Sequence, residues 1–585
     1  MAFVQSTRYR LAWLLAGLFL VQLPFALLMP FHIDDPCFIH IARQVDRDPA
    51  LPMNHPVIFE GRVYLNHMSY SHPPLACYYL WLLEKLSGGH FEKAAHLGFT
   101  VFFLLAAGSL FFLFRFAGLP PVFGTLLAAF APALFVSSHT VMMDVPAFAL
   151  GLAGAVSAMH GLRDGRGRLV WAGSALVGLA GLVSYVAAAH LLVPGVYAIA
   201  SKRFWRYLPA LALPAGLLIG GWLGVVFAAT GQIPFLELGQ MLGRYRAQER
   251  GLLDMRPVYN LVALGGGFFF PLALLARGWR TLRGKACLLL GFGLSAWLAV
   301  RFSDYGYSQQ WVLGILAAAG LVLLVEGLSL AWQSARGRGP LTPPLGWTLA
   351  AWIAVFCCLG VMMFPHGAIR YQLWLVAPLG VALLASVAAA PNAVPGAGGL
   401  SRRKAWLALL VAGQVGLATT LAMADLDLAR GLRRAAVEVF RSGEVRRAPG
   451  TVWVASDWGV RHYILEQGGR TILRYDRRPR PGDWFVRPDR LSPAYPSGYE
   501  QAPYGRLAGT VEVPGRFPVR VLDHAARAGF YSSWWGLLPG WPAEAGQPLE
   551  VLQVFRIERT LPPDPGGEKE NEGFYRLPPG VEIPR

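Results

Sequence analysis

The sequence predicts a polytopic α-helical membrane protein with about thirteen transmembrane helices and a C-terminal soluble α/β domain. The first observation is composition: 55% of the 585 residues are hydrophobic and 15% are charged, with a mean hydropathy of +0.42. The second is that long uncharged runs alternate with short basic loops up to about residue 425. The third is a change after that point, where apolar runs shorten to strand length between prolines and glycines.

The formal net charge of +18 does not indicate a nucleic-acid-binding protein. The basic residues cluster in short loops between apolar runs, at 163–168, 202–206, 277–285, 336–338 and 402–404. Such clusters are typical of the cytoplasmic loops of a membrane protein, and a nucleic-acid-binding face would present them as one patch. We therefore expect contact with membrane lipid and no nucleic-acid partner.

Arg8 and Arg10 place the N-terminus in the cytoplasm, so the first apolar run, 11–31, leads the chain outward. No A-x-A-like cleavage site follows this run, and we expect it to be a retained span. Two short helices are favoured over one long helix within 169–200, because basic loops flank both ends of that stretch. The other spans are expected at 92–116, 122–142, 145–161, 207–229, 258–276, 286–302, 309–332, 346–364, 371–390 and 405–424.

The segment between the first two spans, 32–91, is expected to lie outside the cytoplasm and to contain two surface helices. From Pro36 to Val45 the apolar residues recur at helical spacing, with Asp35 as a cap and Pro36 at the first position. This amphipathic helix is expected to lie flat in the membrane interface. The stretch from Pro74 to Leu86 is too short to span and predicts a second surface helix.

The chain divides into a transmembrane domain at 1–425, a soluble extracytoplasmic α/β domain at 426–560 and a charged Pro/Gly-rich tail at 561–585. A short helix is expected at Val460–Gln467, after the first strand. The strands of the soluble domain are expected at Val452–Ala455, Thr471–Leu473, Trp484–Val486 and Val551–Ile557.

The five cysteines show no spacing typical of a metal site or a disulfide framework. Cys287, Cys357 and Cys358 lie within apolar runs and are expected to be buried thiols. Cys37 and Cys77 are both predicted on the outer side, where either a bridge or two free thiols is compatible with the sequence.

Transfer of a sugar from a lipid-phosphate carrier requires two kinds of group on one side of the membrane. Cations and hydrogen-bond donors must hold the phosphate and stabilise the charge that grows on it. A carboxylate must accept the proton of the attacking hydroxyl. A base at the membrane surface can act on a substrate with a polar head and a lipid tail.

Three aspartates are candidates for the carboxylate. Asp34 and Asp35 follow the first span directly, where a charge is costly unless it has a task. Capping accounts for one acid, Asp35, so Asp34 is the preferred base. Asp144, in Met142-Met143-Asp144-Val145-Pro146, falls between the third and fourth spans, and helix capping is an equal interpretation for it.

Three residues are candidates for holding the donor phosphate. His72 precedes Pro73-Pro74-Leu75, where it is either an imidazole near the phosphate or part of a plain entry to the surface helix. Arg370 and Tyr371 lie where the chain re-enters the membrane, and both side chains donate hydrogen bonds to anionic oxygens. Interfacial anchoring is the alternative, since arginine and tyrosine are common at membrane borders.

Other functions remain compatible with these residues. A transporter or flippase of a lipid-linked sugar is the main alternative, but transporters usually keep ionisable groups near the membrane midplane. Here the polar candidates gather at one surface, which favours an interfacial enzyme. A catalytically inactive relative is a third possibility.

The order of these motifs resembles the GT-C superfamily of lipid-carrier-dependent glycosyltransferases. The order is an acidic pair after span one, a polar residue with Pro-Pro-Leu, Met-x-Asp-x-Pro after span three, and Arg-Tyr opening a late span. Bacterial family-39-type enzymes look most similar, relatives of protein O-mannosyltransferases and of lipid A aminoarabinose and galacturonic acid transferases. The resemblance covers roughly residues 8–425.

The resemblance implies a polyprenyl-phosphate sugar donor, a lipid, glycan or protein acceptor, and inversion at the anomeric carbon. It implies that Asp34 is the catalytic carboxylate, with Asp35 in the adjacent acidic position and Asp144 in the second acidic motif. It assigns Arg370 and Tyr371 to the donor phosphate, while His72 stands where many relatives have lysine. A divalent metal is compatible with it but not required, and the expected location is the inner membrane of a bacterium.

The C-terminal domain carries aromatic motifs that also look like those of a bacterial subset of this family. They are Asp457-Trp458-Gly459 with Tyr463, and Gly529-Phe530-Tyr531 with Trp535-Gly536. Their rings are suited to stacking on a sugar, to forming the domain core or to resting on the membrane. Of the three, the domain core is the favoured interpretation.

Overall fold

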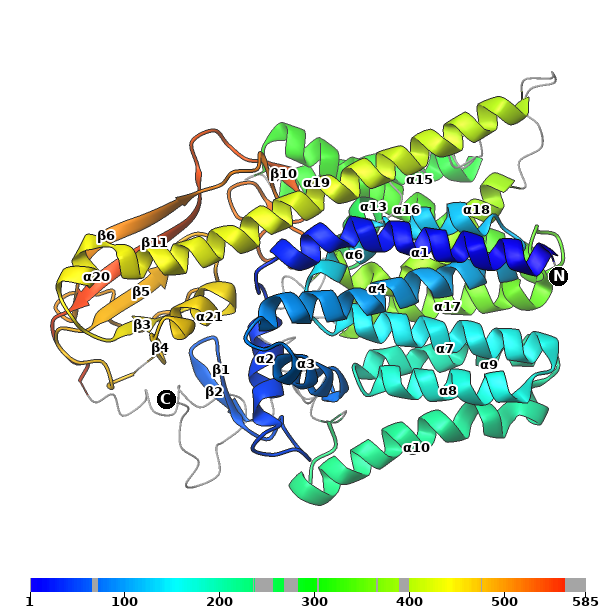
Figure 1. The fold of residues 1–585 in the computed structure, drawn as a ribbon. Helices are drawn as coiled ribbons and strands as arrows, with labels where there is room; N and C mark the ends of the chain where they lie inside the picture. The colour runs from blue at the N-terminus through cyan, green and yellow to red at the C-terminus, as the bar shows by residue number, and fades with distance from the viewer. Residues whose placement is uncertain are drawn as a thin grey trace.

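The computed structural model describes residues 2–65, 72–234, 236, 256–267, 282–301, 305–363, 367–388, 399–474 and 476–562. A bundle of long helices forms one part of the molecule, and a smaller part built around a β-sheet lies at one end of that bundle (Figure 1). The N-terminus lies at the opposite end of the bundle. The fold is therefore a polytopic helical protein with a C-terminal α/β domain, as the sequence predicts.

Seven helices in the described part of the chain are long and apolar enough to cross a membrane. Many of their large apolar side chains are exposed, as expected for surfaces that face lipid. The chain is a multi-pass membrane protein. These helices are α1 (Ala2–Leu28), α4 (Phe91–Phe116), α7 (Asp144–Asp164), α10 (Phe204–Thr230), α16 (Tyr307–Ala335), α17 (Pro343–Met363) and the pair η4 (Arg370–Leu375) and α18 (Val376–Ala388).

The count of about thirteen spans stays a prediction. The stretch 169–200 does form two short helices, α8 (Gly167–Gly181) and the pair η2 (Tyr185–Leu191) and α9 (Leu192–Ala200). The predicted spans at 258–276 and 286–302 overlap α13 (Arg256–Gly267) and α15 (Leu282–Arg301), and part of the first lies outside the described residues.

The predicted span at 122–142 is wrong as a single helix. Helix α5 (Pro121–Ala129) is followed by α6 (Pro132–Phe135) and η1 (Ser137–His139), with a 66° bend between the two parts. Pro132 has no N–H to continue the ladder of α5, and Gln414 donates a side-chain hydrogen bond to the carbonyl of Phe130 at the break. The bend carries residues 137–143 through the buried interior toward the start of α7.

The segment after α1 contains α2 (Asp35–Gln44), a hairpin of β1 (Pro56–Phe59) and β2 (Arg62–Leu65), and α3 (Leu75–Leu86). Both predicted helices are confirmed. The expectation that the first lies flat in the interface is wrong, because eight of its ten residues are buried. It packs between α3 and helix α21 (Trp458–Glu466) of the C-terminal domain. Protein, not lipid, covers its apolar face.

The C-terminal domain is built on a five-stranded sheet in the order β4-β3-β5-β11-β6. Strand β3 pairs parallel with β4 and β5, while β11 pairs antiparallel with β5 and β6. Three predicted strands and the helix are confirmed, while the strand predicted at Thr471–Leu473 overlaps β4 only at Thr471, and the long strand β6 was not predicted. The strands are β3 (Val452–Val454), β4 (Arg470–Thr471), β5 (Trp484–Pro488), β6 (Gly505–Pro514) and β11 (Pro548–Ile557).

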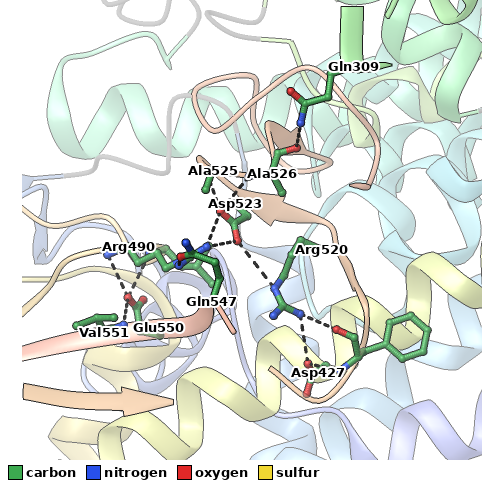
Figure 2. Close-up of polar contacts among 12 residues, drawn as sticks. Gln309, Asp427, Arg490, Arg520, Asp523, Ala525, Ala526, Gln547, Glu550 and Val551 are labelled. Carbon is green, nitrogen blue, oxygen red and sulfur yellow. Dashed lines mark hydrogen bonds and ion pairs between the residues drawn. The ribbon is translucent and has the colours of Figure 1, made fainter. Parts of the chain in front are cut away.

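Helix α19 (Gly399–Arg441) connects the two parts without a break at residue 425 (Figure 1). Asp427 on this helix accepts hydrogen bonds from the backbone N–H groups of Arg516 and Phe517, at 2.7 and 2.9 Å. Figure 2 shows Arg520 between Asp427 and Asp523, with Arg490 beyond them. The predicted domain limits stay predictions, and residues 563–585 of the predicted tail lie outside the described part of the chain.

The cysteines whose side chains the structure describes are free thiols. Cys37 and Cys77 are both buried and free, so no bridge joins them. Cys357 is half-buried, and Cys358 is exposed on α17, contrary to the expectation of a buried thiol. The side chain of Cys287 lies outside the description.

Candidate active site

Asp34 and Arg370, both singled out by the sequence, form an ion pair although 336 positions separate them. The Asp34 Oδ2 atom accepts hydrogen bonds from Arg370 Nη1 at 3.0 Å and Nη2 at 3.1 Å. The Arg370 side chain is 10% exposed and that of Asp34 is 23% exposed, so the pair lies at the edge of the buried interior. A charge-assisted contact of this kind is strong when water is largely excluded.

Tyr371 and Met142 complete the surroundings of the guanidinium. Arg370 Nη2 donates to the Tyr371 hydroxyl at 3.1 Å, and the guanidinium lies 5.0 Å from the centre of the Tyr371 ring. Nη1 also contacts Met142 Sδ at 2.8 Å, from the segment that leads into α7. Besides Asp34, Arg370 is thus held by its own neighbour Tyr371 and by the segment of Met142.

His72 and Asp144 belong to the same cluster of charges. Asp144 is the first residue of α7, and its carboxylate acts electrostatically on His72, Arg370 and Tyr371. Burial lowers the pKa of His72 and outweighs the opposite effect of Asp144, while Arg370 lowers it further. His72 is therefore a neutral imidazole at pH 7, and the permanent cation of the cluster is Arg370.

Two buried nitrogen atoms of this cluster lack hydrogen-bond partners in the described part of the chain: Arg370 Nε and His72 Nδ1. A buried polar atom without a partner is costly, so both atoms are available for contact with a ligand. Both atoms belong to residues predicted to hold an anionic group. Five of the six predicted residues are therefore brought together, and two of them retain unused hydrogen-bonding capacity.

Asp35, the sixth predicted residue, has a different environment. Its carboxylate is fully buried, with Oδ1 accepting from the Val141 backbone N–H at 2.9 Å and Oδ2 from the His32 N–H at 3.1 Å. The prediction that Asp35 caps the following helix is wrong, because it is itself the first residue of α2. Asp34 occupies the cap position but makes no capping bond with its side chain. Asp35 instead ties the segment before α2 to the segment before α7.

Backbone strain occurs directly beside the ion pair. Ile33 has a φ of 50°, in the left-handed region that a β-branched residue rarely adopts. Such a conformation costs on the order of 1–3 kcal/mol and persists only where the surroundings enforce it. On its N-terminal side, the backbone N–H of Phe31 donates to the Tyr463 hydroxyl at 2.8 Å. The turn that presents Asp34 is therefore fixed by its neighbours.

A buried polar group next to the site was not predicted from the sequence. His32 Nε2 lies 3.1 Å from Asp425 Oδ1, and the Tyr531 hydroxyl donates to Asp425 Oδ2 at 2.7 Å. Although burial lowers the pKa of His32, the two carboxylates Asp425 and Asp35 raise it to about 10. His32 is a polar residue close to the acidic pair and Asp425 directly follows the predicted span 405–424, but no sequence signal joins the two.

The aromatic motifs of the C-terminal domain form part of its core. The rings of Trp458 and Trp535 lie 4.9 Å apart, and both side chains are 7% exposed. Tyr531 and Tyr463 are buried as well. The Tyr463 hydroxyl donates to Glu92 Oε2 at 2.6 Å, which connects the domain to the start of α4. The core interpretation is confirmed, and these rings are not a sugar-stacking surface.

The described residues contain no group of three or more His, Cys, Asp or Glu side chains that could hold a metal ion. Asp34 and Asp144 are two carboxylates, and Asp34 is already bonded to Arg370. One or two carboxylates together with a substrate phosphate are enough to hold Mg²⁺, so this donor set does not exclude the metal that the sequence left possible.

The fold and site together define a class: a multi-pass membrane protein with a carboxylate–guanidinium cluster where its apolar helices meet its extramembrane domain. No family model and no curated protein matches the chain. Similar solved structures include arabinofuranosyltransferase AftD from Mycobacteria (14% identity, TM-score 0.42, 93% of this chain and 40% of that one). ArnT from Cupriavidus metallidurans bound to undecaprenyl phosphate is another (16%, TM-score 0.38, 81% and 92%).

A third similar structure is the archaeal oligosaccharyltransferase AglB from Archaeoglobus fulgidus in complex with an inhibitory peptide and a dolichol-phosphate (11%, TM-score 0.43, 78% and 63%). This chain spans 40% of the length of AftD. TM-scores below 0.5 carry no conclusion about the site or the reaction.

Proposed function

We propose that this protein is a membrane glycosyltransferase of the GT-C type that transfers a sugar from a polyprenyl-phosphate donor to an acceptor. One observation supports this above all others. Asp34, Arg370, Tyr371, His72 and Asp144 come from four separate segments and meet where the apolar helices end. The cluster combines an anion-binding arginine with carboxylates, which is the set of groups that the reaction needs.

The donor phosphate binds to Arg370, Tyr371 and His72. Arginine presents five N–H donors in a fixed fork, so it can bond to Asp34 and to a phosphate at once. Arg370 Nε supplies a hydrogen bond that the described residues leave unused, and His72 donates to the phosphate through Nδ1 once that nitrogen carries a proton. These donors lie where negative charge grows as the phosphate leaves, and the burial of Arg370 strengthens their effect.

Asp34 is the general base. The acceptor hydroxyl oxygen forms a bond to the anomeric carbon while the bond from that carbon to the phosphate oxygen breaks. The hydroxyl proton passes to Asp34, and the carrier phosphate leaves with the electron pair. Attack from the face opposite the phosphate inverts the anomeric carbon. The carboxylate of Asp144 acts electrostatically on Tyr371 and His72. In this proposal it orients the acceptor hydroxyl.

The proposed orientation follows from the basic loops. The N-terminus lies in the cytoplasm of a bacterial cell, the helices cross the inner membrane, and the cluster faces the extracytoplasmic side with the C-terminal domain. The carrier tail then stays in the bilayer while its phosphate reaches Arg370. The acceptor is a lipid, a glycan or a protein that meets the site from the same side.

The Asp34→Asn variant tests this proposal. The amide keeps the shape of the side chain but cannot accept the proton, so kcat is expected to fall by about 10²- to 10⁴-fold. The assay supplies purified protein in vesicles with radiolabelled polyprenyl-phosphate sugar and bacterial membrane extract, and it follows labelled acceptor and released carrier phosphate. Asp46→Asn, an exposed aspartate on the same external segment that pairs with Lys85, is the matched control and is expected to remain active.

A fully active Asp34→Asn protein would overturn the assignment of the base. Movement of the intact labelled carrier across the vesicle, without release of carrier phosphate, would show a flippase instead.

A further inference from the structure

The Asp34–Arg370 pair is one link in a closed ring of contacts. Three pairs of adjacent residues form the corners of this ring: Asp34-Asp35, Ile369-Arg370 and Phe530-Tyr531. The first pair stands at the start of α2, the second at the start of η4, and the third belongs to the C-terminal domain. At each corner, one residue contacts the preceding corner of the ring, and its neighbour in the chain contacts the next corner.

The contact between the second and third corners is a backbone hydrogen bond. The Ile369 N–H donates to the Phe530 carbonyl at 3.0 Å. Two further bonds support it, because the Ser533 N–H donates to the Gly367 carbonyl at 2.7 Å and the Gly367 N–H donates to Ser533 Oγ at 3.0 Å. The segment 530–533 is therefore attached directly to the residues that precede Arg370.

The contact between the third and first corners runs through two buried side chains. The Tyr531 hydroxyl donates to Asp425, and Asp425 bonds to His32. The His32 backbone N–H donates to Asp35, and the His32 ring lies 3.6 Å from the same carboxylate. This path fixes the strained turn at Ile33 and hence the position of the next residue, Asp34.

Burial makes this path rigid. His32, Asp35 and Asp425 are 0% exposed and Tyr531 is 1% exposed. Water does not compete for these bonds, and loss of one partner would leave a charged group buried without compensation. The two routes from segment 530–533 therefore hold Arg370 and Asp34 in one fixed relation.

We propose that segment 530–533 of the C-terminal domain positions the two halves of the active site, with Tyr531 as the main positioning residue. This inference rests on the proposed function, in which Asp34 and Arg370 act on the same substrate. It makes the C-terminal domain a structural part of the catalytic centre. A displacement of about 1 Å between reacting groups costs on the order of a hundredfold in rate, so the ring has a direct kinetic consequence.

The Tyr531→Phe variant removes the hydroxyl and leaves the ring to pack. We expect kcat to fall by about a hundredfold, with a smaller change in KM for the polyprenyl-phosphate sugar, because Arg370 remains present but less well aligned. Tyr499→Phe is the matched control. Tyr499 is equally buried in the same domain, and its hydroxyl donates to the Asp476 carbonyl at 3.0 Å, away from the ring. It is expected to keep wild-type kcat.

Hydrogen exchange of the full-length protein measures the same property without any assay of transfer. In Tyr531→Phe, amides in the peptides covering 30–36 and 367–372 are expected to exchange at least tenfold faster, while Tyr499→Phe leaves both peptides unchanged. Ser533→Ala removes one bond to Gly367 from a half-buried position and serves as a milder second variant. It is expected to affect the 367–372 peptide most.

Unchanged exchange in both peptides of Tyr531→Phe and Ser533→Ala would overturn the inference, as would faster exchange with wild-type kcat. A wild-type protein that transfers no sugar would contradict the proposed function instead, and the exchange data would still decide whether Tyr531 holds the two segments.

Discussion

Asp34 and Asp35 are neighbours in the chain but occupy opposite environments. Asp35 is fully buried, and backbone N–H groups from two segments donate to its carboxylate. Asp34 is partly exposed and faces Arg370, whose Nε atom has no hydrogen-bond partner among the described residues. A carboxylate whose lone pairs are occupied by structural bonds is poorly suited to accept a proton from a substrate. The structural role thus falls to Asp35, and the proposed chemical role falls to Asp34.

His32 predicts a pH dependence of stability at the residue scale. Its folded pKa is raised to about 10 from 6.5, mainly through Asp425 and Asp35 acting against burial. Stability from this group is complete below pH 6.5 and is lost as the pH rises to about 10, by at most about 1.4 kcal/mol per pH unit. We expect the Tm in detergent to fall over this range, and a His32→Gln variant, with lower Tm at pH 6.5, to show a flatter decline. Equal slopes for the two proteins would refute this role of His32.

Helix packing at the element scale depends on small residues. Helices α7 and α8 approach so closely at Gly154 and Gly173 that a Cβ atom on either residue would lie 2.5 Å from the carbonyl oxygen of the other. Membrane helices associate through such close backbone contact, since lipid supplies no hydrophobic drive between them. The contact holds α7 in place, and α7 begins at Asp144.

Gly173→Val is expected to force α7 and α8 apart and to destabilise the protein by about 1–3 kcal/mol. The new side chain meets backbone atoms, which cannot rotate away as a side chain would. A thermal shift measured in detergent should show a Tm several degrees lower. Gly216→Val, on α10 with no heavy atom within 4 Å of its Cβ position, is the control and should leave the Tm nearly unchanged. A similar Tm for the two variants would show that the glycine contact is not important.

The bent pair α5 and α6 shows how an irregular element can serve the site. Hydropathy alone predicts one span at 122–142, because neither a proline nor a bend changes the mean hydropathy of the run. The break at Pro132 brings the segment 137–143 inside, where Val141 bonds to Asp35 and Met142 contacts Arg370. A straight helix would carry these residues elsewhere. The irregularity is therefore part of how the site is built.

At the scale of the whole molecule, the C-terminal domain is fastened to the helical part by buried charges. Asp427 on α19 accepts two backbone hydrogen bonds from the domain and lies 3.9 Å from Arg520, whose side chain is 5% exposed (Figure 2). Gln309 on α16 adds a hydrogen bond to the Ala526 carbonyl at 3.2 Å. Both contacts lie close in sequence to the ring that includes Asp425 and Tyr531.

Asp427→Ala should loosen this junction. It leaves the N–H groups of Arg516 and Phe517 without their acceptor and removes one of the two carboxylates beside Arg520, at a cost of about 1–3 kcal/mol. We expect faster limited proteolysis around residues 510–530 and a lower Tm. The control is Glu438→Ala on the same helix, since Glu438 forms an exposed pair with Arg441 and exposed pairs contribute at most about 1 kcal/mol. Equal protease resistance in both variants would mean that Asp427 does not secure the domain.

The sequence by itself determined the class of fold and most of its elements. Hydropathy and basic loops report the local cost of placing each segment in lipid or water, so long helices, the two short helices at 169–200 and three strands of the soluble domain were predictable. The same logic placed Asp34, Asp144, His72, Arg370 and Tyr371 at one surface. Each inference needed only the residues near it in the chain.

Only the tertiary structure decided which of these residues meet and what each one does. The pairing of Asp34 with Arg370, the burial of Asp35 and the path from His32 through Asp425 to Tyr531 join segments hundreds of positions apart. No local preference encodes such contacts, because they arise when packing removes water and each buried charge must find a partner. For the same reason the burial of α2 under the C-terminal domain could not be predicted from its amphipathic pattern, which fits lipid and protein equally well.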